Sequence, residues 1–283
     1  MSKFEFNKIY VLESLDENEE QLTGKELYDD LLRWKEYEFA GKFKAELIQI
    51  HDKIDFFKQL NKIKIECIDL KYYPILHLEI HGSNDTSGLI LKSGELVKWA
   101  ELYDILSDIN LEIGNNLFLT LAVCHGAYLM QLISLNKPAP FYGFIGSFDE
   151  IGIEDLLIRY NEFYKEFLSS FKLDLAFEKL IAANPSIPST YRYISSEETF
   201  KHVYDKYLKE NTSLEGIEKR KTQVIKDENL KFTNRAERRG FEKMFAKKIL
   251  ETREKYYKEH SAIFFMLKRF PKNRQRFNVR EKL

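Results

Sequence analysis

Residues 117–127, Leu-Phe-Leu-Thr-Leu-Ala-Val-Cys-His-Gly-Ala, form the stretch that decides the fold. Its first seven residues are mostly large and apolar, which is the pattern of a strand buried on both faces of a parallel sheet. This strand leads Cys124 into a turn of small and polar residues. Residues 74–80 repeat the arrangement, because they form an apolar strand that ends at His81. The sequence therefore predicts two strands that each end on a reactive side chain.

The segment between these strands predicts how they are related in space. Residues 98–109 have the spacing of an amphipathic helix, with Trp99, Leu102 and Leu106 on one side. A strand, a helix and a second strand form a crossover unit, in which the two strands run parallel. In an open α/β sheet, ligands bind beyond the carboxyl ends of the strands. We therefore expect the imidazole and the thiol at the same edge of the sheet.

Other patterns predict the remaining elements of the chain. Thr23 precedes an apolar helical pattern, and Glu26 three residues later completes a capping box, so Thr23 is the expected N-cap. Helical spacing predicts a helix at residues 43–61, and alternation predicts a strand at residues 63–68. The other expected strands are a first strand at residues 9–15, a hairpin at residues 89–97 and a further strand at residues 141–145. The other expected helices are a short one at residues 127–135 and two longer ones at residues 153–171 and 173–183.

These elements predict an α/β fold class, with a mainly parallel sheet flanked by helices and a helical C-terminal extension. Two prolines in residues 184–189 interrupt the helical pattern and mark the expected boundary. The predicted organisation is a domain at residues 1–184 and a helical, basic extension at residues 185–283.

The composition limits the classes of protein to which the chain can belong. Apolar residues make up 44% of the 283 residues, enough for a sizeable core, but no apolar run reaches the length of about 18 residues that a membrane-spanning helix needs. The first residues lack the apolar stretch of a signal peptide. Two cysteines cannot form a disulfide framework and are typical of a reducing compartment. A cytoplasmic protein without a membrane partner is expected.

Charge is distributed unevenly along the chain. Residues 231–283 hold 17 Lys or Arg and 6 Asp or Glu, which gives this stretch a net charge of +11. The whole chain has a net charge of −1, so residues 1–230 have a net charge of −12. The basic end, at residues 234–239 and 268–277 taken together, mixes cations with aromatic residues, and nucleic-acid-binding proteins use such mixtures for phosphate contact and stacking. The basic end would meet nucleic acid, a partner protein or the acidic body of the chain. A helical cap with a solvated basic face is the simpler interpretation.

The two strand ends predict nucleophilic chemistry. A cysteine becomes a nucleophile when a neighbouring base removes its proton, and the base need not be close in sequence. Cys124 and His81 are the candidate nucleophile and base, and His125 is a second candidate for the base. The amides of Gly82 and Cys124 are the expected oxyanion hole, because glycine lets a substrate carbonyl approach the backbone closely. The alternative is that Cys124 is simply a buried apolar residue.

Motifs for cofactors are not found in the sequence. The six histidines and two cysteines do not have the spacing of a zinc site, and neither a P-loop nor a dinucleotide-binding glycine motif occurs. No metal ion and no cofactor is expected.

The ordered set of motifs resembles the caspase-like cysteine peptidases, and within them the bacterial CHAT branch. The strand ending at His81-Gly82 and the one ending at residues 124–127 carry the resemblance. The other motifs that contribute lie at residues 88–91, 94–96, 99–102, 143–147, 163–164 and Ala176. The resemblance covers residues 8–184 and is strongest at residues 74–183. The Cys-His-Gly run is also similar to that of metacaspases.

The resemblance implies hydrolysis of peptide bonds by a Cys-His dyad, in a protein of bacterial defence or regulated cell death that a sensor partner activates. Cys124 is not followed by the Arg-Gly or Gly-Gly of animal caspases, so their preference for aspartate is not carried over. Relatives that cut after basic residues have an acidic side chain in the first specificity pocket, and Asp149 is the candidate for it. A solvated or helix-capping Asp149 is the alternative, and Asp85 and Asp69 are weaker candidates for the pocket or for orienting His81. The competing function is an inactive adaptor or nucleic-acid-binding protein.

Overall fold

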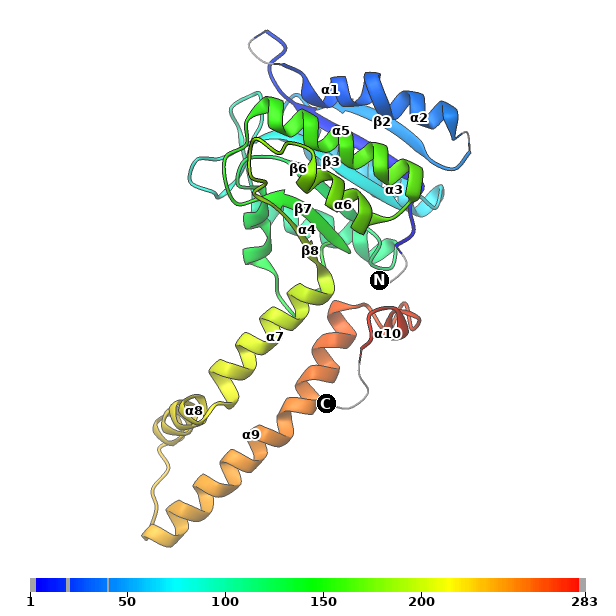
Figure 1. Cartoon of the computed structure of the whole chain (residues 1–283). Helices are drawn as coiled ribbons and strands as arrows, with labels where there is room; N and C mark the ends of the chain where they lie inside the picture. The colour runs from blue at the N-terminus through cyan, green and yellow to red at the C-terminus, as the bar shows by residue number, and fades with distance from the viewer. Residues whose placement is uncertain (1–3, 19–20, 40, 280–283) are drawn as a thin grey trace. The chain divides into compact units, whose positions relative to one another are not determined.

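A mainly parallel β-sheet lies at the centre of the N-terminal part of the chain (Figure 1). The structure is a computed structural model that describes residues 4–18, 21–39 and 41–279. Its contacts divide the chain into two units. The sheet unit runs to Ile133 and includes Ala139–Ser196, whereas the helical unit consists of Ser134–Pro138 and the chain from Glu197 onward.

The main sheet has six strands in the order β2-β1-β3-β6-β7-β8. Their bounds are Lys8–Ser14 (β1), Lys44–Gln49 (β2), Pro74–Gly82 (β3), Phe118–Ala122 (β6), Gly143–Ser147 (β7) and Tyr191–Ser195 (β8). All neighbours are parallel except β7 and β8. A hairpin of β4 (Gly88–Ile90) and β5 (Leu96–Lys98) pairs antiparallel with the end of β3. The predicted α/β class is therefore confirmed.

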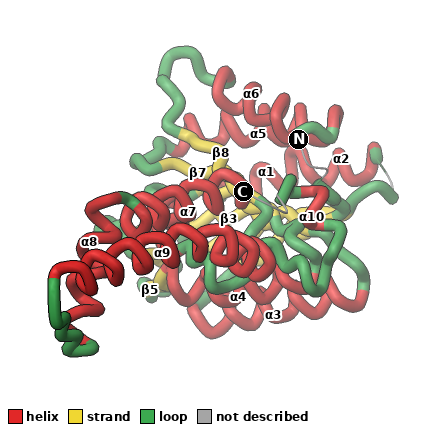
Figure 2. The backbone as a smooth tube through the Cα atoms, turned by 90° about the horizontal axis from the view of Figure 1, so that it is seen from below, coloured by secondary structure: helices red, strands yellow, loops and turns green. Residues whose placement is uncertain are grey.

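Helices cover both faces of this sheet (Figure 2). One face carries α3 (Lys53–Asp69) and α4 (Trp99–Glu112), and the other carries α1 (Thr23–Leu27), α5 (Ile153–Ser170) and α6 (Leu173–Ala182). A π-helical turn, η1 (Tyr28–Leu32), joins α1 to α2 (Arg33–Glu38). The helix expected after Cys124 is a 3₁₀-helix, η2 (Gly126–Leu132). We call the face covered by α5 the α5 face, because the candidate site lies on it.

The helical unit contains α7 (Ser196–Thr212), α8 (Leu214–Asp227), α9 (Arg235–Phe264) and α10 (Asn273–Arg276). Aromatic side chains hold α7 against α9, with ring centroids of Phe200 and Tyr204 5.7 and 5.3 Å from that of Tyr257. Between Glu197 and Val279 no described residue lies in a strand. The helical extension is therefore confirmed, but the sheet unit ends at Ser196 rather than at Asn184, because β8 pairs with β7.

The prediction for residues 43–68 was correct only at residues 53–61, which lie in helix α3. Residues 44–49 are strand β2, and one helix, α3, replaces the expected strand at 63–68. Asp52 caps α3 by accepting the N–H of Asp55 at 2.8 Å. Residues buried along α3 recur at intervals of three and four, and they are Phe56, Leu60, Ile63 and Cys67. The alternation at 63–68 had no structural meaning, because Ile65 is 58% exposed on the outer side of the helix.

The predicted N-cap of α1 was also wrong. Thr23 is already the first residue of α1, and its hydroxyl donates to Oε2 of the buried Glu79 at 2.7 Å. The free amides at the start of the helix instead meet Glu13, whose Oε1 accepts the N–H of Lys25 at 2.9 Å. Burial raises the pKa of the Glu13 carboxyl, and these N–H groups act in the opposite direction. Tertiary contacts thus replace the local cap.

No helix in the described ranges is both long and apolar enough to cross a membrane.

Candidate active site

The register of β3 and β6 sets His81 level with Cys124. The two parallel strands pair from Ile75 with Phe118 to Glu79 with Ala122, always 43 residues apart. His81 and Cys124 are separated by the same interval and lie two residues beyond the last pair. The crossover through α4 therefore brings both to the carboxyl ends of adjacent strands, as the sequence predicted.

Gly82 lies directly against the backbone of Cys124. A Cβ atom placed on Gly82 would lie 1.8 Å from the carbonyl oxygen of Cys124 and 2.7 Å from its carbonyl carbon. No side chain fits into that space. The two strand ends consequently meet backbone to backbone, and only glycine permits this approach.

Both reactive side chains are assigned to the α5 face. Side chains alternate along a strand, so His81 shares its face with His77 and Glu79. The ring of His77 packs against Tyr160 and Tyr164 of α5, at centroid distances of 4.8 and 5.5 Å. Cys124 reaches the start of the same helix, since its Sγ accepts the backbone N–H of Ile151 at 3.3 Å. This N–H holds the half-buried sulfur in place and stabilises negative charge on it.

His125 points to a different partner. Its backbone has a left-handed conformation with φ of 60°, which turns the chain sharply after Cys124. The ring Nδ1 donates to the carbonyl oxygen of Phe148 at 2.8 Å, and the backbone N–H donates to that of Asp149 at 3.2 Å. These contacts anchor His125 to the exit of β7 and leave His81 as the better candidate base.

The amides of Gly82 and Cys124 are suited to the predicted oxyanion hole. The N–H of Ser83 donates to Gly88 on the β4 side of the strand at 2.9 Å. Because successive N–H groups of a strand point to opposite sides, the N–H of Gly82 is directed toward β6. In the described part of the chain, no backbone carbonyl accepts the N–H of Cys124.

Two hollows flank the pair. One, of about 560 Å³, is lined by His81, Gly82 and the loop that follows them to Asp85, together with Ile90 of β4 and Leu96 of β5. The other, also of about 560 Å³, lies at the start of α5 and is lined by Ile151, Ile187 and several acidic residues. Together they provide open space on both sides of the reactive groups, as an extended substrate requires.

Three aspartates were considered from the sequence, and the structure separates them. Asp149 is exposed after the end of β7, where its N–H donates to Oγ of Ser147 at 2.9 Å and its carbonyl oxygen accepts the N–H of His125 at 3.2 Å. Asp85 belongs to the loop after His81, and hydrogen bonds from Ser87 and Ser83 lower the pKa of its carboxyl. Asp69 ends α3, just ahead of β3, and therefore lies at the opposite edge of the sheet. Asp69 cannot orient His81.

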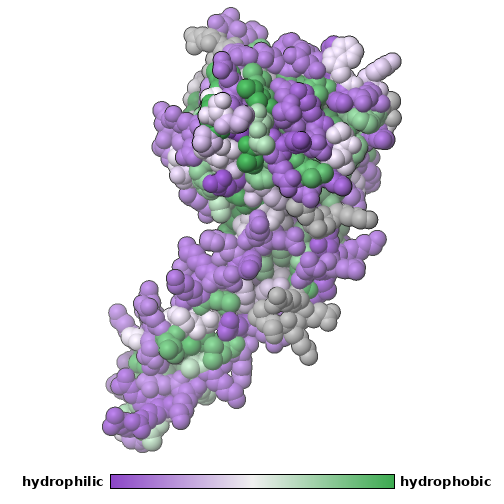
Figure 3. Space-filling model, in the orientation of Figure 1, coloured by the Kyte–Doolittle hydropathy of each residue, from purple (hydrophilic) through white to green (hydrophobic). Residues whose placement is uncertain are grey.

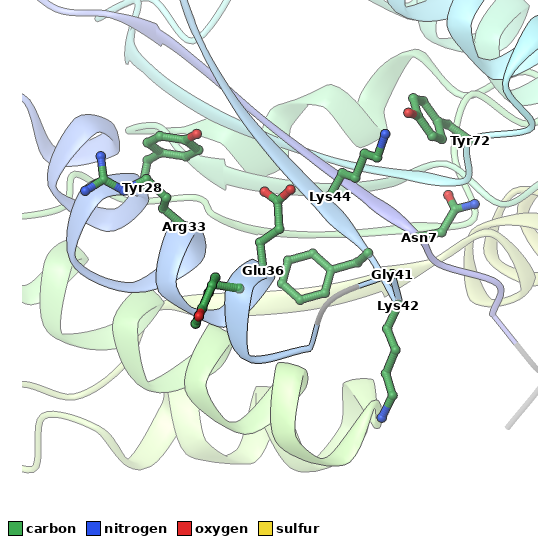
Figure 4. A pocket seen from close by; sticks show the side chains of 10 residues that line it. Asn7, Tyr28, Arg33, Glu36, Gly41, Lys42, Lys44 and Tyr72 are labelled. Atoms are coloured by element: carbon green, nitrogen blue, oxygen red, sulfur yellow. The ribbon is translucent and has the colours of Figure 1, made fainter.

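A third hollow, of about 620 Å³, is separate from the candidate site (Figure 4). Asn7 and Lys44 line it at the beginnings of β1 and β2, whereas His81 lies near the end of β3 and Cys124 follows the end of β6. Figure 4 shows the carboxylate of Glu36 and the ammonium of Lys44 on one side, with Lys42 pointing away. Glu36 accepts the N–H of Ala45 at 2.9 Å, so it completes the edge of the sheet.

Sequence reasoning missed a buried polar chain below the pair. Nε2 of His77 donates to Oε1 of Glu79 at 2.9 Å, and Nδ1 lies 2.8 Å from the hydroxyl of Thr120. That hydroxyl in turn lies 2.7 Å from the hydroxyl of Tyr164. The signal was present in the sequence, because His77 and Glu79 occupy alternate positions of an otherwise apolar strand.

Among the residues that the structure describes, no group of three or more His, Cys, Asp or Glu is arranged to hold a metal ion. Comparisons of the sequence with protein-family models and with curated proteins find no match.

Proposed function

We propose that the chain is a cysteine endopeptidase in which Cys124 is the nucleophile and His81 the general base. The observation that carries the proposal is the level position of the two residues at adjacent strand ends, with Gly82 against the backbone of Cys124. Paired N–H groups beside the sulfur and open hollows on both sides agree with acyl transfer. The sequence resemblance to caspase-like peptidases of the CHAT branch supports the same assignment.

The reaction follows from these groups. His81 takes the proton of the Cys124 thiol, and the sulfur attacks the carbonyl carbon of the substrate, forming an S–C bond. The carbonyl oxygen becomes an oxyanion that the N–H groups of Gly82 and Cys124 stabilise. As the C–N bond breaks, the proton passes from His81 to the leaving amine. Water then attacks the thioester carbon and gives a proton to His81. The C–S bond breaks, the carboxylic acid leaves, and the proton passes from His81 to the sulfur, which restores the thiol.

The same proposal includes specificity and context. The exposed carboxylate of Asp149 would bind a lysine or arginine side chain before the cut, because charge complementarity favours a cation there. By the resemblance, the enzyme acts in the cytoplasm, in bacterial defence or regulated cell death, and a sensor partner activates it.

Cleavage of fluorescently labelled proteins tests the dyad. We expect Cys124→Ala to abolish cleavage and His81→Ala to lower kcat/KM about 10² to 10⁴-fold, the usual contribution of a general base. Cys67→Ala is the matched control, because Cys67 is buried and burial raises its pKa to about 12. Equal cleavage by all variants would exclude the dyad. A peptidyl acyloxymethyl ketone, whose covalent adduct is located by mass spectrometry, provides a second readout that needs only one turnover.

The substrate profile of Asp149→Ala tests the pocket. If Asp149 selects a cation, peptides with Arg or Lys before the cut should lose kcat/KM selectively, while neutral peptides keep it. A profile that matches the unmodified enzyme would remove Asp149 from the proposal.

One observation favours a second function, that of an adaptor which binds nucleic acid. Four exposed cations of α9 recur every four residues, and we call them the α9 ridge: Arg235, Arg239, Lys243 and Lys247. Like charges at this spacing each cost a helix about 0.2–0.5 kcal/mol. Phe241 and Phe245 stack beside the ridge at 5.7 Å, and the face of this unit visible in Figure 3 is mostly hydrophilic. A polyanion would relieve the repulsion.

Binding of fluorescent single-stranded RNA, measured at several salt concentrations, tests the ridge. Replacing Arg235, Arg239 and Lys243 with glutamine should weaken binding and reduce the slope of log K against log salt by about 2, since each phosphate contact contributes about 0.7. The control changes Lys255 and Lys258, which pair with Glu259 and Glu254 at 3.8 and 3.0 Å. An equal effect of both sets would show that charge alone, rather than the ridge, determines binding.

A further inference from the structure

One row of the sheet lies immediately below His81 and Cys124 on the α5 face. Glu79 pairs with Ala122, and at the far side of the sheet Ser147 pairs with Tyr191. The register of β6 and β7, in which Thr120 pairs with Ile145, sets Ala122 level with Ser147. Glu79 and Tyr191 therefore occupy the same level on one face.

Two tyrosine hydroxyls are buried in this region without a partner. The rings of Tyr160 and Tyr191 pack edge to face at 5.5 Å, and Tyr191 is 1% exposed. Neither hydroxyl has a hydrogen-bond partner in the described structure. Leaving such a group unsatisfied is costly, so a buried hydroxyl without a partner calls for a functional or structural reason.

The two hydroxyls differ in the charged groups around them, and Cys124 is near only one of them. Burial is the main cause that raises the pKa of both tyrosines well above the ordinary value. Negative charge at Glu79 adds to this rise for both, whereas a Cys124 thiolate adds to it only for Tyr191. The hydroxyl of Tyr191 therefore stays protonated at any working pH and lies within electrostatic reach of the sulfur.

We propose that Tyr191 is a positioning residue of the Cys124 site, whose hydroxyl donates a hydrogen bond to the sulfur when the thiolate forms. The inference rests on the proposed function, in which Cys124 reacts as a thiolate. It gives the unpartnered hydroxyl a role, because the cost of its burial in the resting protein is recovered when negative charge develops on the sulfur. The N–H of Ile151 is the first donor to this atom, and Tyr191 supplies a second from strand β8.

Alkylation of Cys124 by iodoacetamide across a range of pH tests this role, with the modified peptide quantified by mass spectrometry in the full chain. We expect Tyr191→Phe to slow alkylation about five- to tenfold near pH 7, the effect of one hydrogen bond, and to move the pH profile upward. The plateau at high pH, where the sulfur is fully ionised, should not change. Tyr160→Phe removes an equally buried hydroxyl on which Cys124 exerts no electrostatic effect, and its profile should match the unmodified protein.

An unchanged profile for Tyr191→Phe would overturn the proposal, and so would equal shifts for both variants. If Tyr191→Phe fails to fold, 3-fluorotyrosine at position 191 replaces it, because its more acidic hydroxyl is a stronger donor and should move the profile downward. A profile that stays fixed with fluorotyrosine would again overturn it. The alkylation readout does not depend on cleavage. A protein that cleaves no substrate would contradict the peptidase proposal, but the effect of Tyr191 on the reactivity of Cys124 could still be measured.

Discussion

Gly82→Ala is expected to lower kcat/KM for peptide cleavage about a hundredfold, because a displacement of about 1 Å between catalytic groups and substrate has effects of that size. The added methyl group would lie 1.8 Å from the carbonyl oxygen of Cys124, and both atoms belong to backbone that cannot rotate away. One of the two strand ends must move. Overpacking of this kind also lowers the free energy of unfolding by about 1–3 kcal/mol, which urea denaturation measures.

Gly152→Ala is the local control for this variant. Gly152 is the N-cap of α5, close in sequence to the Ile151 amide that contacts the sulfur, and a Cβ there would meet nothing within 4 Å. Its φ of −73° suits alanine, so a change below about 1 kcal/mol is expected. If Gly82→Ala behaved like Gly152→Ala, the two strand ends would not lie as close as described.

Arg159→Met is expected to lower the free energy of unfolding by about 3–5 kcal/mol, as is usual when one partner of a buried ion pair is removed. The guanidinium is fully buried, and its Nε donates to Asp155 at 2.7 Å. Its Nη1 donates to the carbonyl groups of Leu180 and Ile181 at 2.9 Å, and its Nη2 donates to that of Ile187 at 2.6 Å. The variant would leave these carbonyls without the guanidinium, and Asp155 would lose its cation and keep only the hydrogen bond from the side chain of Asn184.

Chemical denaturation of two further variants separates burial from charge. Arg192 is exposed, so Arg192→Met should change stability by no more than about 0.5 kcal/mol. Changing Asp155 to leucine in the Arg159→Met background should recover part of the loss, because it removes the unpaired charge. If Arg159→Met lowered the free energy of unfolding no more than Arg192→Met does, the hydrogen bonds of the buried guanidinium would contribute little to stability.

The sequence predicted the structure correctly where a local pattern was compatible with only one kind of element. The apolar strands that end at His81 and Cys124, and the amphipathic helix between them, left only a parallel crossover. The candidate pair could therefore be brought to one edge of the sheet without coordinates. The contact between Gly82 and Cys124 could not be derived in the same way, because it depends on how the chain bends after Ala122.

Other features depend on contacts that are distant in sequence. Ile48 and Ile50 fit both a strand and a helix, and only pairing with β1 selects the strand for residues 44–49. β8 is short and carries the exposed Arg192, so its assignment depends on β7. The buried Arg159 follows Leu156, Leu157 and Ile158 in the sequence, and the carbonyl groups that it meets come from α6 and the loop that follows.

The two cysteines have different environments, and this determines how the chain responds to oxidation. Cys67 is buried near the end of α3, before β3 begins, whereas the half-buried Cys124 follows the opposite ends of the strands. A disulfide requires two Cα atoms within about 7 Å, so the two sulfurs of one chain cannot join. An oxidant would therefore link two copies of the chain through Cys124, and a reductant would release both thiols together.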